Sequence, residues 1–147
     1  TTEPIYSRPF RQKEPLLRLS KSALITVYPL KDGRLLLVIN VHAINFTLGV
    51  EAYQNQIEAI SKHVMLHRGP VIFGGDFNTW SRPRLLLLYR FARKMGLRRV
   101  EFEDDQRKSV FKNPLDFIFY RDLTLIRSEV ISTDASDHNP MRATFAL

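Results

Sequence analysis

The sequence predicts an α/β fold in which a mixed, mainly antiparallel sheet carries two main helices on one face. Short apolar runs bounded by turn residues recur along the chain, as in β-strands. Two longer segments repeat their apolar residues at steps of three and four, as in amphipathic helices. A chain of 147 residues with 44% hydrophobic content is large enough for one core, so we expect a single domain.

The first part of the chain predicts a β-hairpin that follows an extended lead-in. Residues 1–21 contain three prolines and many charges without clear periodicity, so we interpret them as the lead-in. Residues 23–28 and 34–42 are apolar runs, and the Lys-Asp-Gly turn at 31–33 suits a hairpin because Asp-Gly tolerates positive φ. We therefore expect these two strands to pair in antiparallel orientation.

Two helices are predicted on either side of a short buried strand at 71–73. The first helix covers about 49–67 and is ended by Gly69 and Pro70, and the second starts near Pro83 and stops at Gly96. The apolar positions that define them are Val50, Tyr53, Ile57, Ile60 and Val64 in the first helix and Leu85, Leu88, Ala92 and Met95 in the second.

The last third of the chain returns to strands. Residues 101–113 are polar and are expected to form a loop. The apolar runs at 115–120, 123–131 and 141–145 are expected to complete the sheet.

Composition excludes several classes of protein. The chain has no cysteine, which excludes disulfide frameworks, zinc-thiolate sites and thiol catalysis and is compatible with the cytoplasmic location that we expect. No apolar run reaches the ~18 residues of a transmembrane segment. The net charge of +7 favours an anionic partner. Residues 82–99 form a run of cations without an acid, which is either a solvated helix face or a phosphate-binding surface. These cations are Arg82, Arg84, Arg90, Arg93, Lys94, Arg98 and Arg99.

Polar side chains gather at the ends of the predicted strands. The buried strand at 71–73 stops in two glycines and at once presents a carboxylate and a carboxamide, which is where open α/β sheets bind ligands. Strands that lie side by side would bring such groups together along one edge. The residues concerned are Asn40, His42, Asn45, Asp76, Asn78, Asp116, Asp137 and His138.

Four motifs between Asn40 and Pro140 carry a family resemblance. In chain order they are Asn-x-His, Gly-Asp-Phe-Asn, Leu-Asp-x-Ile-Phe and Ser-Asp-His-x-Pro. The series resembles the carboxyl-terminal half of the endonuclease/exonuclease/phosphatase superfamily, and its flanking context is closest to a bacterial, YafD-like branch. The resemblance implies a DNase I-like fold, with residues 22–147 as half of a four-layer α/β sandwich. It also implies hydrolysis of phosphate esters.

The resemblance implies roles for the downstream residues. Asp116 would orient His138, which acts as a base or as an electrostatic partner, so we expect their side chains within about 2.6 to 3.2 Å of one another. Asp137 is the predicted metal ligand, and Mg²⁺ or Mn²⁺ suits a site rich in oxygen and free of thiols. In an alternative reading, Asp137 and His138 form a polar turn ended by Pro140.

The upstream residues are assigned to the attacking water and to the phosphate. Asp76 would position or deprotonate the water, and Asn78 would donate to the developing phosphoryl charge. His42 and Asn45 would hold phosphate oxygens, and Asn40 is also assigned to phosphate binding. As alternatives, His42 could bond to a backbone carbonyl and Asn40 could tie two loops together.

Two motifs of the family are absent from the sequence, namely a metal-binding Asn near the end of an early strand and a metal-binding Glu in a Gln-Glu pair. We therefore expect the amino-terminal half of a catalytic domain to be missing. The intact protein would be a metal-dependent phosphodiester or phosphomonoester hydrolase, acting on a phosphate ester such as nucleic acid, and this chain alone would be inactive. The alternative is a catalytically incomplete module that binds phosphate polymers or a partner. An uncovered sheet face predicts self-association or pairing with the missing half.

Overall fold

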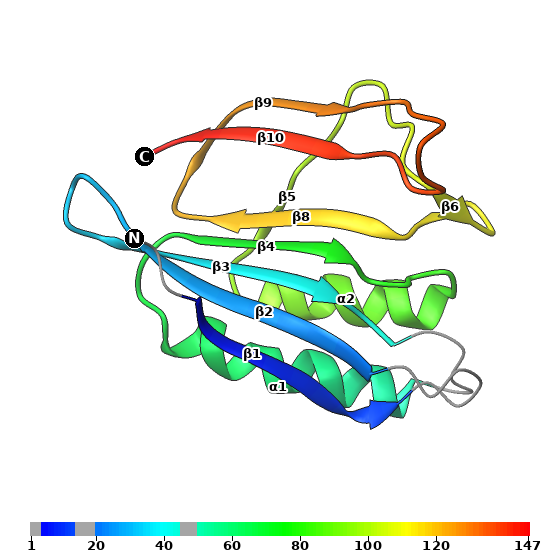
Figure 1. The fold of residues 1–147 in the computed structure, drawn as a ribbon, viewed down its shortest axis with the longest axis horizontal. Coiled ribbons are helices and arrows are strands. Elements are labelled where there is room, and N and C mark those ends of the chain that lie inside the picture. Colours follow the sequence, from blue (N-terminus) through cyan, green and yellow to red (C-terminus); the bar gives the residue numbers. More distant parts are fainter. Residues whose placement is uncertain (1–3, 14–19, 45–49) are drawn as a thin grey trace.

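The computed structural model describes residues 4–13, 20–44 and 50–147. Its main sheet consists of β1 (Pro4–Lys13), β2 (Ser20–Pro29), β3 (Leu35–His42), β4 (Val71–Asp76), β5 (Arg98–Arg99) and β8 (Asp116–Arg121). The spatial order is β1-β2-β3-β4-β8-β5 (Figure 1). Neighbouring strands are antiparallel except for β3 and β4, which run parallel. The predicted α/β class with a mixed, mainly antiparallel sheet is thus confirmed.

The predicted hairpin is formed by β2 and β3, whose pairing runs from Ser22 opposite His42 to Pro29 opposite Leu35. Its turn has the expected chemistry. Gly33 adopts φ +85°, a left-handed conformation that favours glycine. The Asp32 carboxylate accepts a hydrogen bond from the backbone N–H of Arg34 at 3.0 Å, as Asp does in such turns.

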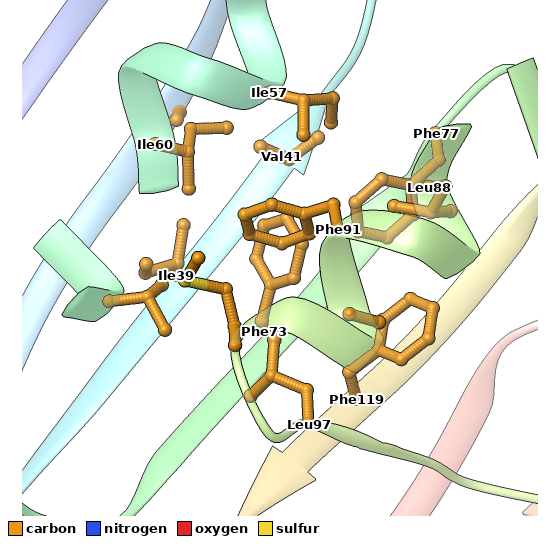
Figure 2. Close-up of a cluster of buried hydrophobic side chains, with 14 of the residues drawn as sticks. Ile39, Val41, Ile57, Ile60, Phe73, Phe77, Leu88, Phe91, Leu97 and Phe119 are labelled. Carbon is orange, nitrogen blue, oxygen red and sulfur yellow. The ribbon is translucent and has the colours of Figure 1, made fainter. Parts of the chain in front are cut away.

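Two helices, α1 (Glu51–Leu66) and α2 (Arg82–Lys94), cover one face of the main sheet as predicted (Figure 1). Their apolar sides and the inward residues of β3, β4 and β8 form the main core (Figure 2). The Phe73 ring lies at its centre, with its centroid 4.9 Å from that of Phe77 and 5.5 Å from that of Phe91, both edge to face. Removing such a buried ring costs about 3–5 kcal/mol. Phe73 thereby packs β4 against Phe91 of α2 and against Phe77, which follows the strand.

Arg121, at the end of β8, ties both helices to the sheet. Its guanidinium donates to the Met95 carbonyl that follows α2 at 3.0 Å and to the His67 carbonyl that follows α1 at 2.7 Å. These carbonyls have no partner within a helix, and a cation is favourable beside them because of the helix dipole. Each helix therefore ends against the same strand.

The extended lead-in predicted for residues 1–21 contains a strand that the sequence did not predict. Residues Pro4–Lys13 form β1, which pairs antiparallel with β2, and β2 itself begins at Ser20. β1 is an edge strand, where proline is tolerated because one side of the strand needs no ladder hydrogen bonds. Register shifts occur between Pro4 and Tyr6 and between Pro9 and Lys13, so the strand lacks the regular alternation from which strands are predicted.

The prediction that three final strands complete the sheet is correct only for β8. Strands β9 (Thr124–Val130) and β10 (Met141–Ala146) form a separate two-stranded sheet. The side of β8 that faces away from β4 is taken by β5, which pairs with it at Tyr120 and Phe119. The β9–β10 hairpin instead packs through a second apolar cluster, in which the Phe145 ring centroid lies 5.1 Å from that of Tyr120.

The segment expected to be a loop at 101–113 is mostly irregular, with one short strand, β6 (Ser109–Val110), that pairs with β7 (Asn113–Pro114). Within the described parts of the chain, no helix combines the length and the apolar character needed to cross a membrane.

Candidate active site

Three adjacent strands present one row of ionisable side chains. In the register of the main sheet, His42 of β3 lies opposite Asp76 of β4, and Asp76 lies opposite Asp116 of β8. Residues of one row share a face, and this face is the one opposite the helices, because Val41 and Phe117, the neighbours in sequence, point into the main core. The parallel pairing of β3 and β4 therefore brings the ends of the predicted motifs together.

The predicted contact between Asp116 and His138 is confirmed. The Nδ1 atom of His138 lies 2.6 Å from Oδ2 of Asp116, although 22 positions separate the two residues in sequence. Asp116 is only 7% exposed, and a carboxylate at such a position is stable only with a partner. His138 is that partner, so the Ser-Asp-His motif docks onto β8. The backbone N–H of His138 also donates to Ser136 Oγ at 3.2 Å, so the polar turn of the alternative reading exists as well.

The electrostatics of this pair favour a protonated imidazole. Burial alone would lower the pKa of His138, but the hydrogen bond to Asp116 and the charges of Asp116, Asp76 and Asp137 raise its pKa above the ordinary value. Burial raises the pKa of Asp116, while the hydrogen bond from His138 opposes that shift. We place the shared proton on the imidazole, because a carboxyl that starts near 4 stays ionised beside an imidazole that starts near 6.5.

Asp76 lies between two imidazoles. Its Oδ2 atom is 3.7 Å from Nε2 of His42 and 4.0 Å from Nε2 of His138. Its Oδ1 atom accepts the backbone N–H of Asn78 at 2.8 Å, which fixes the orientation of the carboxylate. Oδ2 of Asp76 is therefore directed at a space that both imidazoles border.

The glycine before Asp76 is required by close approach of the backbone. Gly75 has φ +136°, and a Cβ atom at this position would lie 2.0 Å from the Val41 carbonyl oxygen. No residue with a side chain fits there without moving β3 or β4. The Gly-Gly pair thus explains how β4 can bring Asp76 beside the end of β3.

Asn78 has a structural contact that the sequence did not reveal. Its side chain is buried, and Nδ2 donates to the Ala43 carbonyl at 2.8 Å. The residue also adopts φ +47°, a left-handed conformation that Asn tolerates better than most residues. Asn78 therefore links the loop after β4 to the loop after β3, and its assignment as a donor to the phosphoryl group stays a prediction.

The remaining predicted residues differ in their placement. Asn40 is exposed on the face that carries His42, and its Oδ1 lies beside Gly75. The His42 side chain is 57% exposed. Asn45 lies outside the described residues. Asp137 is exposed and is not among the three residues whose potential ligand atoms gather, so its assignment as the metal ligand also stays a prediction.

A cation could be held by the carboxylates of Asp76 and Asp116, and His138 would join them as a ligand only in its neutral form, with the cation displacing the Nε2 proton. One ligand atom from each of these residues lies within 4.8 Å of the others. Two carboxylates suit Mg²⁺ or Mn²⁺, and the imidazole suits Mn²⁺ better than Mg²⁺. The donor set therefore fits a divalent cation, but it supplies at most half of the ~6 ligands that such an ion takes.

Two arginines that support the site were missed by sequence reasoning. Arg107 donates to the Asp116 carbonyl at 2.9 Å and pairs with Asp105, with its guanidinium 4.9 Å from the centroid of the Phe117 ring. Nothing in the surrounding polar segment distinguishes it. Arg84 of α2 is buried. The sequence did contain a signal for this burial, because Arg84 lies one helical turn before the apolar Leu88 and therefore on the same side of the helix.

Comparison with known proteins agrees with these motifs. The sequence profile described as the Endonuclease/Exonuclease/phosphatase family matches residues 16–138. UPF0294 proteins are similar over nearly the whole chain: one from Yersinia enterocolitica is 58% identical over 144 residues, and one from Klebsiella pneumoniae is 56% identical over 146 residues. The matches cover 98% and 99% of this chain but 55% of each relative. The chain thus spans about half the length of these curated relatives.

Solved structures share the fold at low sequence identity. An endonuclease/exonuclease/phosphatase family protein from Leptotrichia buccalis superposes with a TM-score of 0.69 at 20% identity, covering 99% of this chain and 62% of that one. D. rerio TDP2 complexed with a single-strand DNA product gives 0.66 at 17% identity, covering 99% and 69%. A mannosyl-6-phosphatase from Bacteroides thetaiotaomicron gives 0.66 at 17% identity, covering 99% and 67%. The match of residues 16–138, which is more than half of the chain, shows that the chain belongs to the endonuclease/exonuclease/phosphatase family.

Proposed function

We propose that this chain carries the acid–base half of a phosphoesterase site, which hydrolyses a phosphodiester or a phosphomonoester. The observation that carries the proposal is the position of His138, whose Nδ1 bonds to Asp116 and whose Nε2 lies 4.0 Å from Asp76. Hydrolysis of a phosphate ester requires neutralisation of phosphoryl charge and a group that accepts a proton from water. Family membership supports the same reaction class.

Protonation divides the two tasks between His138 and Asp76. Burial opposes the shift, but the hydrogen bond to Asp116 and the nearby carboxylates raise the pKa of His138 and favour its charged form, which stabilises a phosphoryl oxygen. Asp76 is less buried than Asp116 and accepts the proton of the attacking water. His42 borders the same space from the other side of Asp76 and donates to a second phosphate oxygen. Asp116 keeps the imidazole of His138 in place.

A divalent ion would be held by the carboxylates of Asp76 and Asp116, with Asp137 as a further ligand from the neighbouring loop. When bound, Mg²⁺ or Mn²⁺ supplies charge neutralisation and acidifies water. The cluster leaves such an ion short of ligands, and the family relatives are almost twice as long as this chain. We infer that the additional length found in those relatives contributes the other ligands, and that this chain alone hydrolyses substrate weakly or not at all.

The proposed substrate is a phosphate ester on an anionic molecule. The net charge of +7 attracts such substrates at long range. Two of the structural neighbours are described with a single-strand DNA product and as a mannosyl-6-phosphatase, so both nucleic acids and small phosphate esters belong in the test panel.

The charge also favours a second candidate function, in which the chain binds phosphate polymers without hydrolysing them. Arg90, Arg93, Lys94, Arg98 and Arg99 are exposed on α2 and β5. An array of exposed cations neutralises phosphates regardless of sequence and makes binding sensitive to salt.

A substrate panel separates the two candidates. Two proteins are compared, namely this chain and a longer polypeptide that matches the length of the Yersinia relative. Each is incubated, with Mg²⁺ or Mn²⁺, with single- and double-stranded DNA, RNA, inositol phosphates and bis-p-nitrophenyl phosphate. The proposal expects turnover by the longer polypeptide and its loss in His138→Ala. Salt-sensitive nucleic-acid binding without turnover in either length would refute the hydrolase and support the binding module.

A further inference from the structure

Arg84 is the largest fully buried side chain among the described residues, with an exposed fraction of 0%. The cation run at 82–99 predicted either a solvated helix face or a phosphate-binding surface, and for Arg84 both readings are wrong. Arg82 and Arg90, on the same helix, are exposed. Burying a charge costs free energy unless the surroundings compensate it. The contacts of Arg84 show where that compensation lies.

One guanidinium nitrogen of Arg84 joins the two loops of the candidate site. Its Nη1 donates to the Ile44 carbonyl at 2.7 Å and to the Asn78 carbonyl at 3.2 Å. Ile44 comes two residues after His42, the last residue of β3, and Asn78 comes two residues after Asp76, the last residue of β4. In each loop, Arg84 thus binds the carbonyl of the residue that lies two positions after the site residue.

Aromatic rings fix the plane of this guanidinium. Its central carbon lies 5.1 Å from the centroid of the Tyr53 ring and 4.9 Å from that of the Trp80 ring. Arginine combines stacking on rings with several donors in one rigid plane, which lysine cannot reproduce. The contact set therefore selects for arginine and for one orientation of it.

The two loops also bond to each other above Arg84. The Ala43 N–H donates to the Asp76 carbonyl at 2.8 Å, and Asn78 Nδ2 donates to the Ala43 carbonyl at 2.8 Å. Ile44 is held from α1 through its N–H, which donates to Gln56 Oε1 at 2.9 Å. The two loops are thus joined to each other through Ala43 and are also held by the buried side chains of Gln56 and Arg84.

We infer that Arg84 is a positioning residue, which keeps the loops after β3 and β4 together so that His42 and Asp76 face one another at 3.7 Å. It acts through the backbone carbonyls of the two loops. The consequence for turnover rests on the proposed phosphoesterase function, whereas the consequence for the loops does not. Small displacements of site residues reduce rates strongly, because reacting groups must meet at about 3 Å.

The test compares Arg84→Met and Arg84→Lys with Arg90→Met, a matched control that removes an exposed cation from the same helix. The first readout is hydrogen exchange, measured in this chain at the amides of Ala43, Ile44 and Asn78 and, for the core, at Val41 and Phe73. The second is the kinetics of the longer polypeptide on the substrate that the panel identifies. Arg84→Met should fold, because an apolar side chain can replace a buried charge.

Arg84→Met should accelerate exchange of the three loop amides by about 10-fold or more, with less than about 2-fold change in the core. It should lower kcat by about 30-fold or more and change KM by less than about 3-fold. Arg84→Lys should recover only part of both losses, and Arg90→Met should match the wild type.

Three results would overturn the inference: unchanged loop exchange in Arg84→Met, equal acceleration in loops and core, or full recovery by Arg84→Lys. If the wild-type polypeptide hydrolyses no substrate, the proposed function fails, and the exchange rates still decide whether Arg84 holds the loops.

Discussion

The imidazole of His138 bridges two carboxylates from neighbouring strands, because its Nδ1 atom lies 2.6 Å from Oδ2 of Asp116 and its Nε2 atom lies 4.0 Å from Oδ2 of Asp76. Asp76 and Asp116 stand opposite one another in the register of β4 and β8. The sheet therefore sets the spacing of the carboxylates, and the loop before β10 supplies the group between them. The proposed hydrolysis depends on this one side chain.

Replacing Asp116 should change the titration of His138. Asp116→Asn removes the negative charge and leaves at most a neutral amide acceptor, so the pKa of His138 should fall toward or below the ordinary value of about 6.5. The measurement is an NMR titration of the His138 ring protons. Asp134→Asn is the control, because it removes an exposed acid from the same loop, and it should leave the pKa of His138 unchanged. An unshifted pKa in Asp116→Asn would contradict the pairing.

The same shift predicts how stability depends on pH. A raised pKa in the folded state means that protonation of His138 favours folding. This contribution is fully present below the unfolded-state pKa of about 6.5 and is lost as the pH rises through the folded-state pKa. The difference in unfolding free energy between wild type and Asp116→Asn should therefore be larger at pH 6 than at pH 9, as urea denaturation at both values can show. A constant difference would exclude the linkage.

Mn²⁺ binding should depend on the three clustered residues. We expect Asp76→Asn to weaken Mn²⁺ binding to this chain by about 10-fold or more, because it removes an ionised oxygen ligand. Isothermal titration calorimetry measures the affinity, with Asp134→Asn as the control for loss of one negative charge. Asp137→Asn tests the ligand predicted from the sequence. If it weakens binding and Asp76→Asn does not, the ion sits on the outer loop and not in the cluster.

Gly75 and Gly33 provide a matched pair for backbone effects. Both have positive φ, but a Cβ at Gly33 meets nothing within 4 Å, whereas a Cβ at Gly75 would lie 2.0 Å from the Val41 carbonyl oxygen. Gly33→Ala should cost about 1–2 kcal/mol of unfolding free energy for the left-handed conformation alone. Gly75→Ala should cost about 3 kcal/mol or more, because β3 and β4 must separate. Urea denaturation of both variants checks the order, and equal losses would contradict the close approach.

Local patterns in the sequence were enough to predict the helices and the hairpin, but β4 continues through both glycines to Asp76 and does not end at the predicted residue 73. The steps of three and four from Tyr53 to Val64 and the Asp-Gly turn each encode their own structure. The partner of a strand is not encoded in this way. Nothing within residues 124–130 shows that β5 already pairs with β8, so the separate β9–β10 sheet was not predicted.

The site shows the same division. The contact between Asp116 and His138 was predicted, because a carboxylate inside an apolar strand requires a partner and the motif order supplied one. The burial of Arg84 was not, since a run of cations gives the same pattern whether one member points inward or outward. Its place on the apolar stripe of α2, one turn before Leu88, was the available signal.

The sheet face that carries the site should promote self-association of this chain. Leu24 lies on it beside Asn40 and is 43% exposed, and Val38 and Ile72, which are paired in the next row, are only partly buried. Apolar side chains left accessible on one sheet face favour association. We expect sedimentation velocity to show a concentration-dependent dimer or larger species. Leu24→Lys should shift the distribution toward monomer, because a charge then has to be buried at the contact.

Leu86→Lys is the matched control for this prediction. It introduces the same charge at a leucine that is 49% exposed on α2, on the opposite side of the sheet. It should leave the association unchanged, because α2 and α1 already cover that side. A monomeric wild-type chain at all concentrations would contradict the prediction, and so would equal effects of the two substitutions. The same measurement can be made on a polypeptide as long as the UPF0294 relatives. If it is monomeric both with and without Leu24→Lys, the additional chain covers this face.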